Sequence, residues 1–227
     1  RAKCLQRLVR LDLPVPKTVA LSFDAIKEIV SGKMPNLIDI LSNFDEKETL
    51  CVRPSSESID WGGPGAVLNI GMNEERCLHL SKYIGEKAAS ALYFRFIQAY
   101  SVSVARLDPD VFDHITGANG NSVSAALAAY KDEMTENFPQ SIEHQLSEVL
   151  RSMARAWEGT SARLLREAKG APADAGLGLV IQKMAFGVGD GESGSGVLQL
   201  VNSDTGLSQI TGRYLRQSQG RESLSDK

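Results

Sequence analysis

A long central stretch, residues 76–169, carries almost no strand pattern, and it constrains the fold more than any other feature. Its apolar residues recur at three- and four-residue spacing, which is typical of helices with one buried face. The recurring positions are Leu92, Phe96, Ala99, Tyr100 and Ser103, then Leu146, Val149, Leu150, Met153 and Trp157. We interpret the aromatic residues among them as core rather than as walls of a cofactor pocket. The stretch predicts an all-helical insertion, which we place at residues 76–175.

Short strands and helices are predicted on both sides of this insertion. Before it, the pattern predicts a helix at 1–12, a strand at 18–21, a helix capped by Ser22, a short helix near 37–44 and a strand at 50–53. After it, strands are predicted at 177–186, 197–201 and 207–215, with the glycine-rich segment 187–196 as a hairpin connection between the first two. The fold class is therefore α+β, with an outer part made of residues 1–75 and 176–227.

The composition of the 227 residues is ordinary for a globular protein, with 42% hydrophobic and 23% charged residues. The formal net charge of −3 favours neither nucleic acid nor an anionic membrane as a partner. No apolar run approaches the roughly 20 residues that a membrane-spanning helix needs. We therefore expect no nucleic-acid partner and no membrane partner, and the sequence leaves self-association open.

The three cysteines and three histidines are scattered along the chain. Cys4, Cys51 and Cys77 form no Cys-x-x-Cys pair, which favours reduced thiols in a cytoplasmic protein. The histidines, His79, His114 and His144, do not have the spacing of a metal-ligand set. The chain starts at Arg1 without a methionine, and we expect it to be a piece of a longer protein that continues past Lys227.

Residues 53–71 combine the features of a phosphate-binding segment. Arg53 ends a short apolar strand, and hydroxyl residues and the glycines Gly62, Gly63 and Gly65 follow it. Glycine lets backbone N–H groups approach an anion closely, and a guanidinium matches phosphate oxygens. Arg53 could also be a surface arginine in a salt bridge, and the glycine-rich segment 187–196 could be an ordinary hairpin. Together they allow a nucleotide held between two β layers, with a mobile flap over its phosphates.

Several motifs, in the same order along the chain, give the sequence a resemblance to a known family. They lie at residues 13–16, 52–53, 67–73, 95–100, 138–140, 181–187, 193–197, 212–215 and 219–220. In these motifs the chain resembles the N-terminal nucleotide-binding domain of the pyruvate phosphate dikinase family, with phosphoenolpyruvate synthase as a more distant relative. The matches are spread over nearly the whole length, so that chance similarity is a poor explanation.

The resemblance implies an ATP-grasp-type fold with a helical insertion in its first half. In that family, a kinase-type transferase, this domain binds Mg-ATP and passes a phosphoryl group to a histidine on another domain. A barrel domain then interconverts pyruvate and phosphoenolpyruvate. The sequence contains neither the family's Thr-Ser-His phosphoacceptor motif nor the barrel. The implied partners are therefore ATP and a histidine-bearing phosphocarrier domain in the same or another chain, and residues 176–227 are expected to be truncated relative to the family.

The resemblance also assigns candidate site residues. Arg53 matches the arginine that clamps the ATP phosphates and is the candidate catalytic residue, and Arg1 stands where the family has a phosphate-binding lysine. Four residues match the strand that lines the adenine pocket: Gln182, Lys183, Met184 and Ala185. Backbone amides of this strand could read the adenine edge. Four residues match the flap over the phosphates: Ser193, Gly194, Ser195 and Gly196. Gln219 matches a glutamine near the phosphates and the metal.

Three departures from the family concern the phosphate side. Arg1 replaces the lysine, Glu57 replaces a second arginine, and Arg213 replaces an acidic residue near the triphosphate and Mg²⁺. An arginine cannot ligate a hard cation, so the metal ligands stay unknown, with Asp190, Asp204 and Glu222 as loose candidates. Two hypotheses follow. The chain is the ATP-binding portion of a dikinase-like phosphotransferase, or it is a divergent, catalytically impaired nucleotide-binding or protein-interaction module on the same fold.

Overall fold

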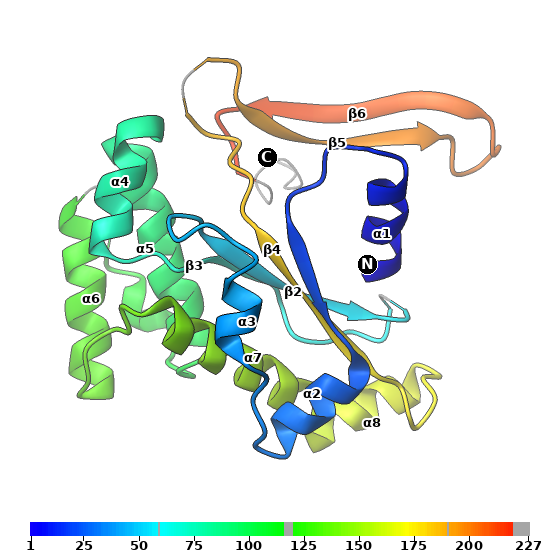
Figure 1. Cartoon of the computed structure of the whole chain (residues 1–227), viewed down its shortest axis with the longest axis horizontal. Coiled ribbons are helices and arrows are strands. Elements are labelled where there is room, and N and C mark those ends of the chain that lie inside the picture. Colours follow the sequence, from blue (N-terminus) through cyan, green and yellow to red (C-terminus); the bar gives the residue numbers. More distant parts are fainter. Residues whose placement is uncertain (59, 116–119, 190, 220–227) are drawn as a thin grey trace.

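The computed structural model describes residues 1–58, 60–115, 120–189 and 191–219. Its central element is a four-stranded antiparallel sheet in the order β1-β4-β2-β3. The strands are β1 (Thr18–Leu21), β2 (Leu50–Ser56), β3 (Val67–Ile70) and β4 (Leu177–Lys183). The sheet therefore joins segments from both ends of the sequence, as Figure 1 shows. The mixed architecture confirms the predicted α+β class.

The stretch between β3 and β4 is helical, as predicted. It comprises α4 (Glu74–Ile84), α5 (Glu86–Ser103), the short 3-10 helix η1 (Pro109–Phe112), α6 (Gly120–Met134), α7 (Ile142–Glu158) and α8 (Thr160–Ala168). Phe138 lies at the centre of its aromatic residues, with ring centroids 5.7 Å from Phe96, 5.2 Å from Tyr100 and 5.2 Å from Tyr130. All four side chains are at least 95% buried, which confirms that the aromatic residues form the core.

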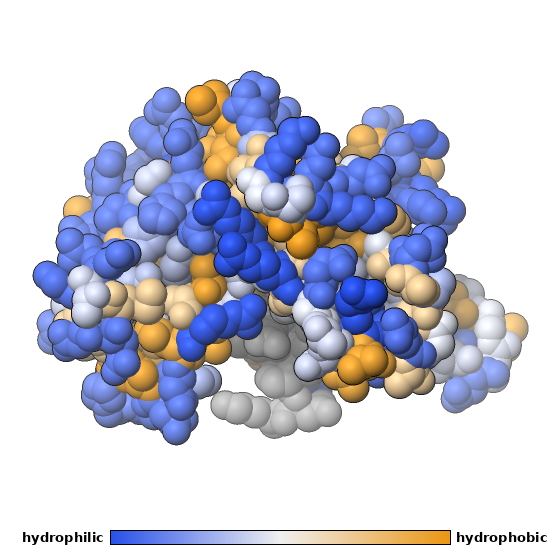
Figure 2. Space-filling model, turned by 90° about the horizontal axis from the view of Figure 1, so that it is seen from below, coloured by the Kyte–Doolittle hydropathy of each residue, from blue (hydrophilic) through white to orange (hydrophobic). Residues whose placement is uncertain are grey.

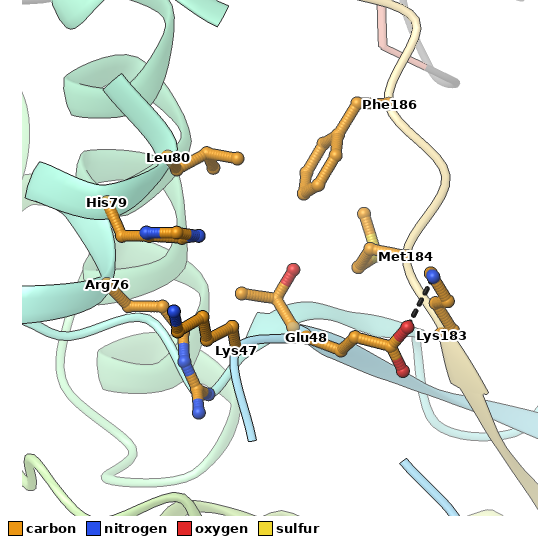
Figure 3. A pocket seen from close by; sticks show the side chains of 9 residues that line it. Lys47, Glu48, Arg76, His79, Leu80, Lys183, Met184 and Phe186 are labelled. Carbon is orange, nitrogen blue, oxygen red and sulfur yellow. Dashed lines mark ion pairs between the residues drawn. The ribbon is translucent and has the colours of Figure 1, made fainter. Parts of the chain in front are cut away.

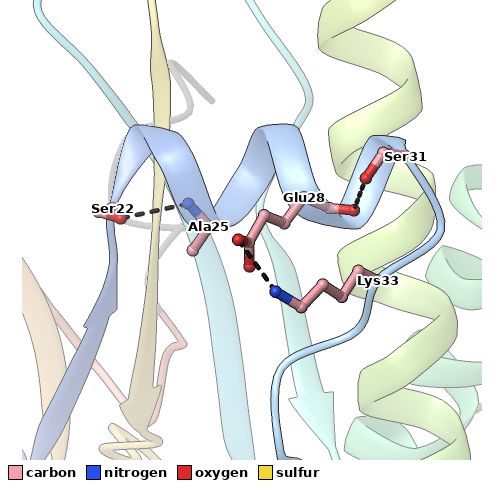
Figure 4. A network of polar contacts seen from close by, with 5 residues as sticks. All are labelled: Ser22, Ala25, Glu28, Ser31 and Lys33. Atoms are coloured by element: carbon pink, nitrogen blue, oxygen red, sulfur yellow. Dashed lines mark hydrogen bonds and ion pairs between the residues drawn. The ribbon is translucent and has the colours of Figure 1, made fainter.

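Three helices precede or flank the first strands: α1 (Ala2–Arg10), α2 (Phe23–Val30) and α3 (Leu37–Leu41). Figure 4 shows how local contacts define α2. The Ser22 hydroxyl accepts a hydrogen bond from the Ala25 N–H, which confirms the predicted N-cap. At the other end Gly32 adopts a φ of 97°, and the Lys33 N–H donates to the Glu28 carbonyl at 2.9 Å. This left-handed glycine ends the helix.

The two faces of the four-stranded sheet differ. Val19, Ile181 and Val52 lie side by side on one face and join the hydrophobic core, against which α2 and α7 pack. Thr18, Gln182 and Cys51 lie side by side on the other face. Away from the core, the face in Figure 2 is mostly hydrophilic, with apolar side chains in small separate groups. Within the described residues no helix is long and apolar enough to cross a membrane.

The predicted hairpin at residues 187–196 is wrong. Strand β4 ends at Lys183 and pairs with β1 and β2, whereas β5 (Gly194–Val201) pairs with β6 (Ser208–Arg216) in a separate two-stranded sheet. The glycine-rich segment therefore connects two different sheets (Figure 1). The strands β5 and β6 approach closely, because a Cβ on Gly196 would lie 2.5 Å from the Arg213 carbonyl oxygen. The predicted strand at 207–215 is confirmed as β6.

Strand β2 is longer than predicted and runs past Arg53 to Ser56. Pro54 and Ser55 remain paired with Leu179 and Gly178 of β4. Proline is tolerated there because the pairing with β3 ends at Val52, so beyond that residue one side of β2 needs no N–H donor. As a result Arg53 lies within the sheet rather than at the start of a loop.

Candidate functional site

Two arginines, one within β2 and one directly before α1, lie close together. The Arg1 guanidinium donates to the Pro54 carbonyl at 2.6 Å, and the Ala2 N–H donates to the Ser55 hydroxyl at 3.1 Å. Partial burial lowers the pKa of Arg1, and the neighbouring charge of Arg53 lowers it further. The structure therefore brings together the two residues that the sequence assigned to the phosphates. The N-terminus of α1 adds its partial positive charge at the same place.

Neither arginine has a counter-charge in the described part of the chain. No hydrogen bond or ion pair between described residues engages the Arg53 guanidinium. The thiol of Cys51, two residues away on the same face of β2, interacts with both arginines. Burial raises the pKa of Cys51, although the two arginine charges partly offset that effect, and the thiol is only 5% exposed. Two adjacent cations without a carboxylate favour the binding of an anion.

The four predicted adenine residues lie at the end of β4, where the chain leaves the sheet. Gln182 is buried, and its side-chain amide donates to the Thr18 hydroxyl at 2.8 Å. The Lys183 N–H donates to the Lys17 carbonyl and the Met184 N–H to the Thr49 carbonyl, each at 2.9 Å. These two amides are therefore already used within the protein. Any base that binds here would meet the Met184 side chain and the segment around Ala185 instead.

Lys183 forms an ion pair with Glu48 across the end of the sheet (Figure 3). The Glu48 side chain is 13% exposed, so this pair is better shielded than a surface pair. Burial alone would raise the pKa of Glu48, but the hydrogen bonds from Lys183 and from the Asp45 N–H outweigh it and lower that pKa. The same contact with Glu48 raises the pKa of Lys183. This pair was not predicted from the sequence.

Replacing Glu48 with glutamine should make the free energy of unfolding less dependent on pH in the acidic range. Because the pKa of Glu48 is lowered by folding, its contribution is present above the unfolded value of about 4.3 and is lost as the pH falls through the lower folded value. We expect Glu48→Gln to cost about 1 kcal/mol at pH 7 and almost nothing near pH 3. Urea unfolding at both pH values measures this. The exposed pair of Glu28 with Lys33 supplies the control variant Glu28→Gln, which should cost about 0.3 kcal/mol or less. Equal costs of Glu48→Gln at both pH values would contradict the assignment.

Two cavities flank the Glu48–Lys183 pair. The larger has a volume of about 460 Å³ and is lined by Val15, Pro16, Lys17, Asp45, Glu48, Lys183, Met184 and Ala185. It contains three of the four residues predicted for adenine, and its size is within the usual range for small-molecule sites. The smaller has a volume of about 150 Å³ and lies between α4 and the segment that follows β4 (Figure 3). Its lining is Lys47, Glu48, Thr49, Arg76, His79, Leu80, Lys183, Met184 and Phe186.

The predicted flap residues are tied to the segment that follows β6. Gly194, Ser195 and Gly196 lie in β5, and the Ser195 hydroxyl is 2.7 Å from that of Ser218. The Gln217 N–H donates to the Ser193 carbonyl at 2.8 Å.

Gln219 lies beside the glycine-rich segment, where its side-chain amide donates to the Ala185 carbonyl at 2.8 Å and accepts from the Gly187 N–H at 2.7 Å. These contacts connect the predicted flap and Gln219 to the end of β4.

Two of the departures from the family, Glu57 and Arg213, lie in different parts of the fold. Glu57 is exposed just after β2, Arg213 lies in β6 opposite Val197, and Asp204 lies in the turn between β5 and β6. Asp190 and Glu222 lie outside the described residues. Over the described ranges, no group of three or more His, Cys, Asp and Glu side chains could hold a metal ion. The arginine pair is suited to an anion, and Asp204, the one metal candidate among the described residues, belongs to no such group.

Comparison with known proteins supports the resemblance. No family model matches the chain. The chain is 30% identical over 190 residues to a pyruvate, phosphate dikinase from Clostridium symbiosum, which covers 75% of this chain and 22% of that protein. It is 25% identical over 217 residues to the enzyme of that name from Rickettsia conorii, with 87% of this chain and 24% of that protein covered. It is also 25% identical to the chloroplastic protein of that name from Flaveria trinervia, with 96% of this chain and 26% of that protein covered.

The chain spans about a quarter of the length of these curated relatives, between 22% and 26% in the three comparisons above. The aligned part nevertheless takes in three quarters or more of the chain itself. The resemblance predicted from the motifs is confirmed, and the chain is homologous to a part of the pyruvate, phosphate dikinases.

Proposed function

We propose that this chain is the ATP-binding portion of a dikinase-like phosphotransferase with an ATP-grasp-type nucleotide site. The observation that carries the proposal is the uncompensated pair Arg1 and Arg53 at the N-terminus of α1. Forked guanidinium groups bind phosphate oxygens with two parallel hydrogen bonds, and a helix N-terminus stabilises the same charge. Homology to proteins named pyruvate, phosphate dikinase supports the same role. The division into residues 1–75, 76–175 and 176–227 is part of this proposal.

The larger cavity is the proposed site of the base. Val15, Pro16 and Met184 supply apolar walls, and Asp45 supplies an acceptor for an exocyclic amine. Arg53 lies opposite Val180 on β4, three residues before Lys183 at the edge of the cavity. Three residues of strand span about 10 Å, a separation that ribose and the first phosphates can bridge. We therefore place the base beyond the end of β4 and the phosphates beside Arg53.

The arginines would hold the phosphates and neutralise the charge that spreads over a transferred phosphoryl group. Mg²⁺ supplies further charge neutralisation when it enters with ATP. The described residues assemble no carboxylate cluster for it, so we derive no step through the metal. We further propose that a histidine on another domain or chain accepts the phosphoryl group. Interconversion of pyruvate and phosphoenolpyruvate would then occur outside these residues.

Calorimetric titration of the chain with ATP, with and without Mg²⁺, tests the proposal. We expect Arg53→Ala to weaken ATP binding about 10- to 100-fold, the effect of losing a charge-assisted hydrogen bond or two. Arg163→Ala is the matched control, because Arg163 is exposed on α8, and it should bind ATP as the unchanged chain does. No ATP binding by the unchanged chain, or equal affinity in Arg53→Ala, would overturn the proposal.

A further inference from the structure

We propose that the smaller cavity, between α4 and the end of β4, is a binding site for a small carboxylic acid with a short apolar body. The site lies beside the larger cavity and shares Glu48, Lys183 and Met184 with it, but its test does not use ATP. It is lined from three directions (Figure 3). His79 and Leu80 come from α4, Lys47 comes from the turn before β2, and Phe186 comes from the segment that follows β4.

An unsatisfied hydroxyl is the first sign of a ligand. Thr49 lines the cavity and is only 4% exposed, yet its Oγ1 has no hydrogen-bond partner among the described residues. Buried polar atoms are nearly always paired, so an orphaned one marks a place for a water or a ligand atom. A hydroxyl can donate to a carboxylate oxygen. The Thr49 side chain therefore marks the polar end of the cavity.

The charge around the cavity selects an acidic ligand. Lys47, Arg76 and Lys183 contribute three positive charges and Glu48 contributes one negative charge, which leaves two positive charges when His79 is neutral. Glu48 is already paired with Lys183, and Arg76 has the carboxylates of Glu75 and Glu46 near it, so the excess among the lining residues lies mainly on Lys47. Arg76 is anchored, since its guanidinium donates to the Gly71 carbonyl at 3.0 Å and to the Glu46 carbonyl. The Arg76 guanidinium therefore supplies a positive charge at a fixed position, and the exposed Lys47 supplies a donor that can move.

The apolar walls favour a carboxylate over inorganic phosphate. Leu80, Met184 and Phe186 face the cavity in Figure 3 and would contact a short hydrocarbon group. A phosphate ion has no apolar part for these walls and needs more donors than Thr49 and Lys47 supply. The volume of about 150 Å³ is below the usual range for drug-sized ligands. Both facts point to a short-chain monocarboxylate.

The probe is sodium butyrate, titrated into the intact chain and followed by two-dimensional NMR, with n-butanol and inorganic phosphate as separate arms. We expect saturable shifts at Thr49, His79 and Leu80 with butyrate, and at least tenfold weaker binding of the other two probes. Thr49→Val keeps the shape, removes the hydroxyl and should weaken butyrate binding about tenfold. Thr211→Val, on the exposed face of β6, is the matched control and should leave binding unchanged.

Lys47→Met provides a second variant in case Thr49→Val fails to fold, because Lys47 is exposed and methionine keeps most of its stem. It should weaken butyrate binding about fivefold and leave binding of butanol unchanged. Absence of saturable shifts, or equal affinity of butyrate for both variants and the unchanged chain, would overturn the proposal. If butanol binds as tightly as butyrate, the cavity recognises only the apolar group and not the carboxylate. If phosphate binds more tightly than butyrate, the ligand is an inorganic anion and not a carboxylic acid. None of these outcomes depends on whether the chain binds ATP.

Discussion

Replacing Trp157 with alanine should lower the free energy of unfolding by about 3–5 kcal/mol, the range for truncating a large buried aromatic residue. Trp157 is 1% exposed at the end of α7, and its indole N–H donates to the Ala175 carbonyl at 3.2 Å. The Arg166 guanidinium lies 3.8 Å from the ring centroid and donates to the Trp157 carbonyl at 2.6 Å. Truncation would therefore leave a cavity, an unpaired carbonyl and a buried cation without its aromatic partner.

The effect should extend to the glycine-rich loop that follows Arg53. Gly63 adopts a φ of 136°, and a Cβ there would lie 3.2 Å from the Trp157 ring, so the loop rests directly on the indole. We expect Trp157→Ala to increase proteolysis near Gly62 in addition to lowering the urea midpoint. Leu164→Ala on α8 is the control, because Leu164 is 61% exposed and should cost about 0.5 kcal/mol or less. If Trp157→Ala lowers the free energy of unfolding no more than the control does, the indole does not anchor the loop around Gly63.

Local sequence signals predicted most of the individual elements. The strand at 18–21 and the cap at Ser22 are present as predicted, because alternation and a side-chain cap depend only on neighbouring residues. The hairpin at 187–196 failed, because strand partners are chosen by contacts far along the chain. Gln219 binds the backbone at Ala185 and Gly187, more than thirty positions earlier. No short-range pattern around residue 187 encodes that contact.

The candidate site, like the fold, was predicted in its local features but not in its long-range contacts. Arg53 and the glycines after it indicated an anion site from residue type alone, whereas the role of Arg1 came from the family resemblance. The ion pair of Glu48 with Lys183 and the orphaned Thr49 hydroxyl were missed. Both features depend on how deeply the fold buries the residues directly before β2. Tertiary packing decides which polar groups are buried. Here the ion pair lines both cavities, and Thr49 lines the smaller one.

Gln145 joins the backbone at Gly71 and Met72 to the backbone at Pro139, and replacing it with leucine should cost about 3 kcal/mol or more. Its side chain is fully buried, and its Oε1 accepts from the Gly71 N–H at 2.6 Å. Its Nε2 donates to the Met72 carbonyl at 3.0 Å and to the Pro139 carbonyl at 2.7 Å. Leucine has a similar volume but leaves the Gly71 N–H unpaired in the interior, and each buried group left unsatisfied costs about 1–3 kcal/mol.

Urea unfolding of Gln145→Leu and Gln140→Leu provides the comparison, because both variants lose the same amide. Gln140 is exposed, and its amide donates to the Phe138 carbonyl at 3.0 Å and more weakly to the Tyr93 hydroxyl at 3.4 Å, so Gln140→Leu should cost about 1 kcal/mol. Hydrogen exchange at the Gly71 amide should accelerate only in Gln145→Leu. The residues that Gln145 holds come directly before α4, which carries Arg76, His79 and Leu80 of the smaller cavity, so butyrate binding should weaken with it. If Gln145→Leu is as stable as Gln140→Leu, the Gly71 N–H has another acceptor and the buried amide does not position α4.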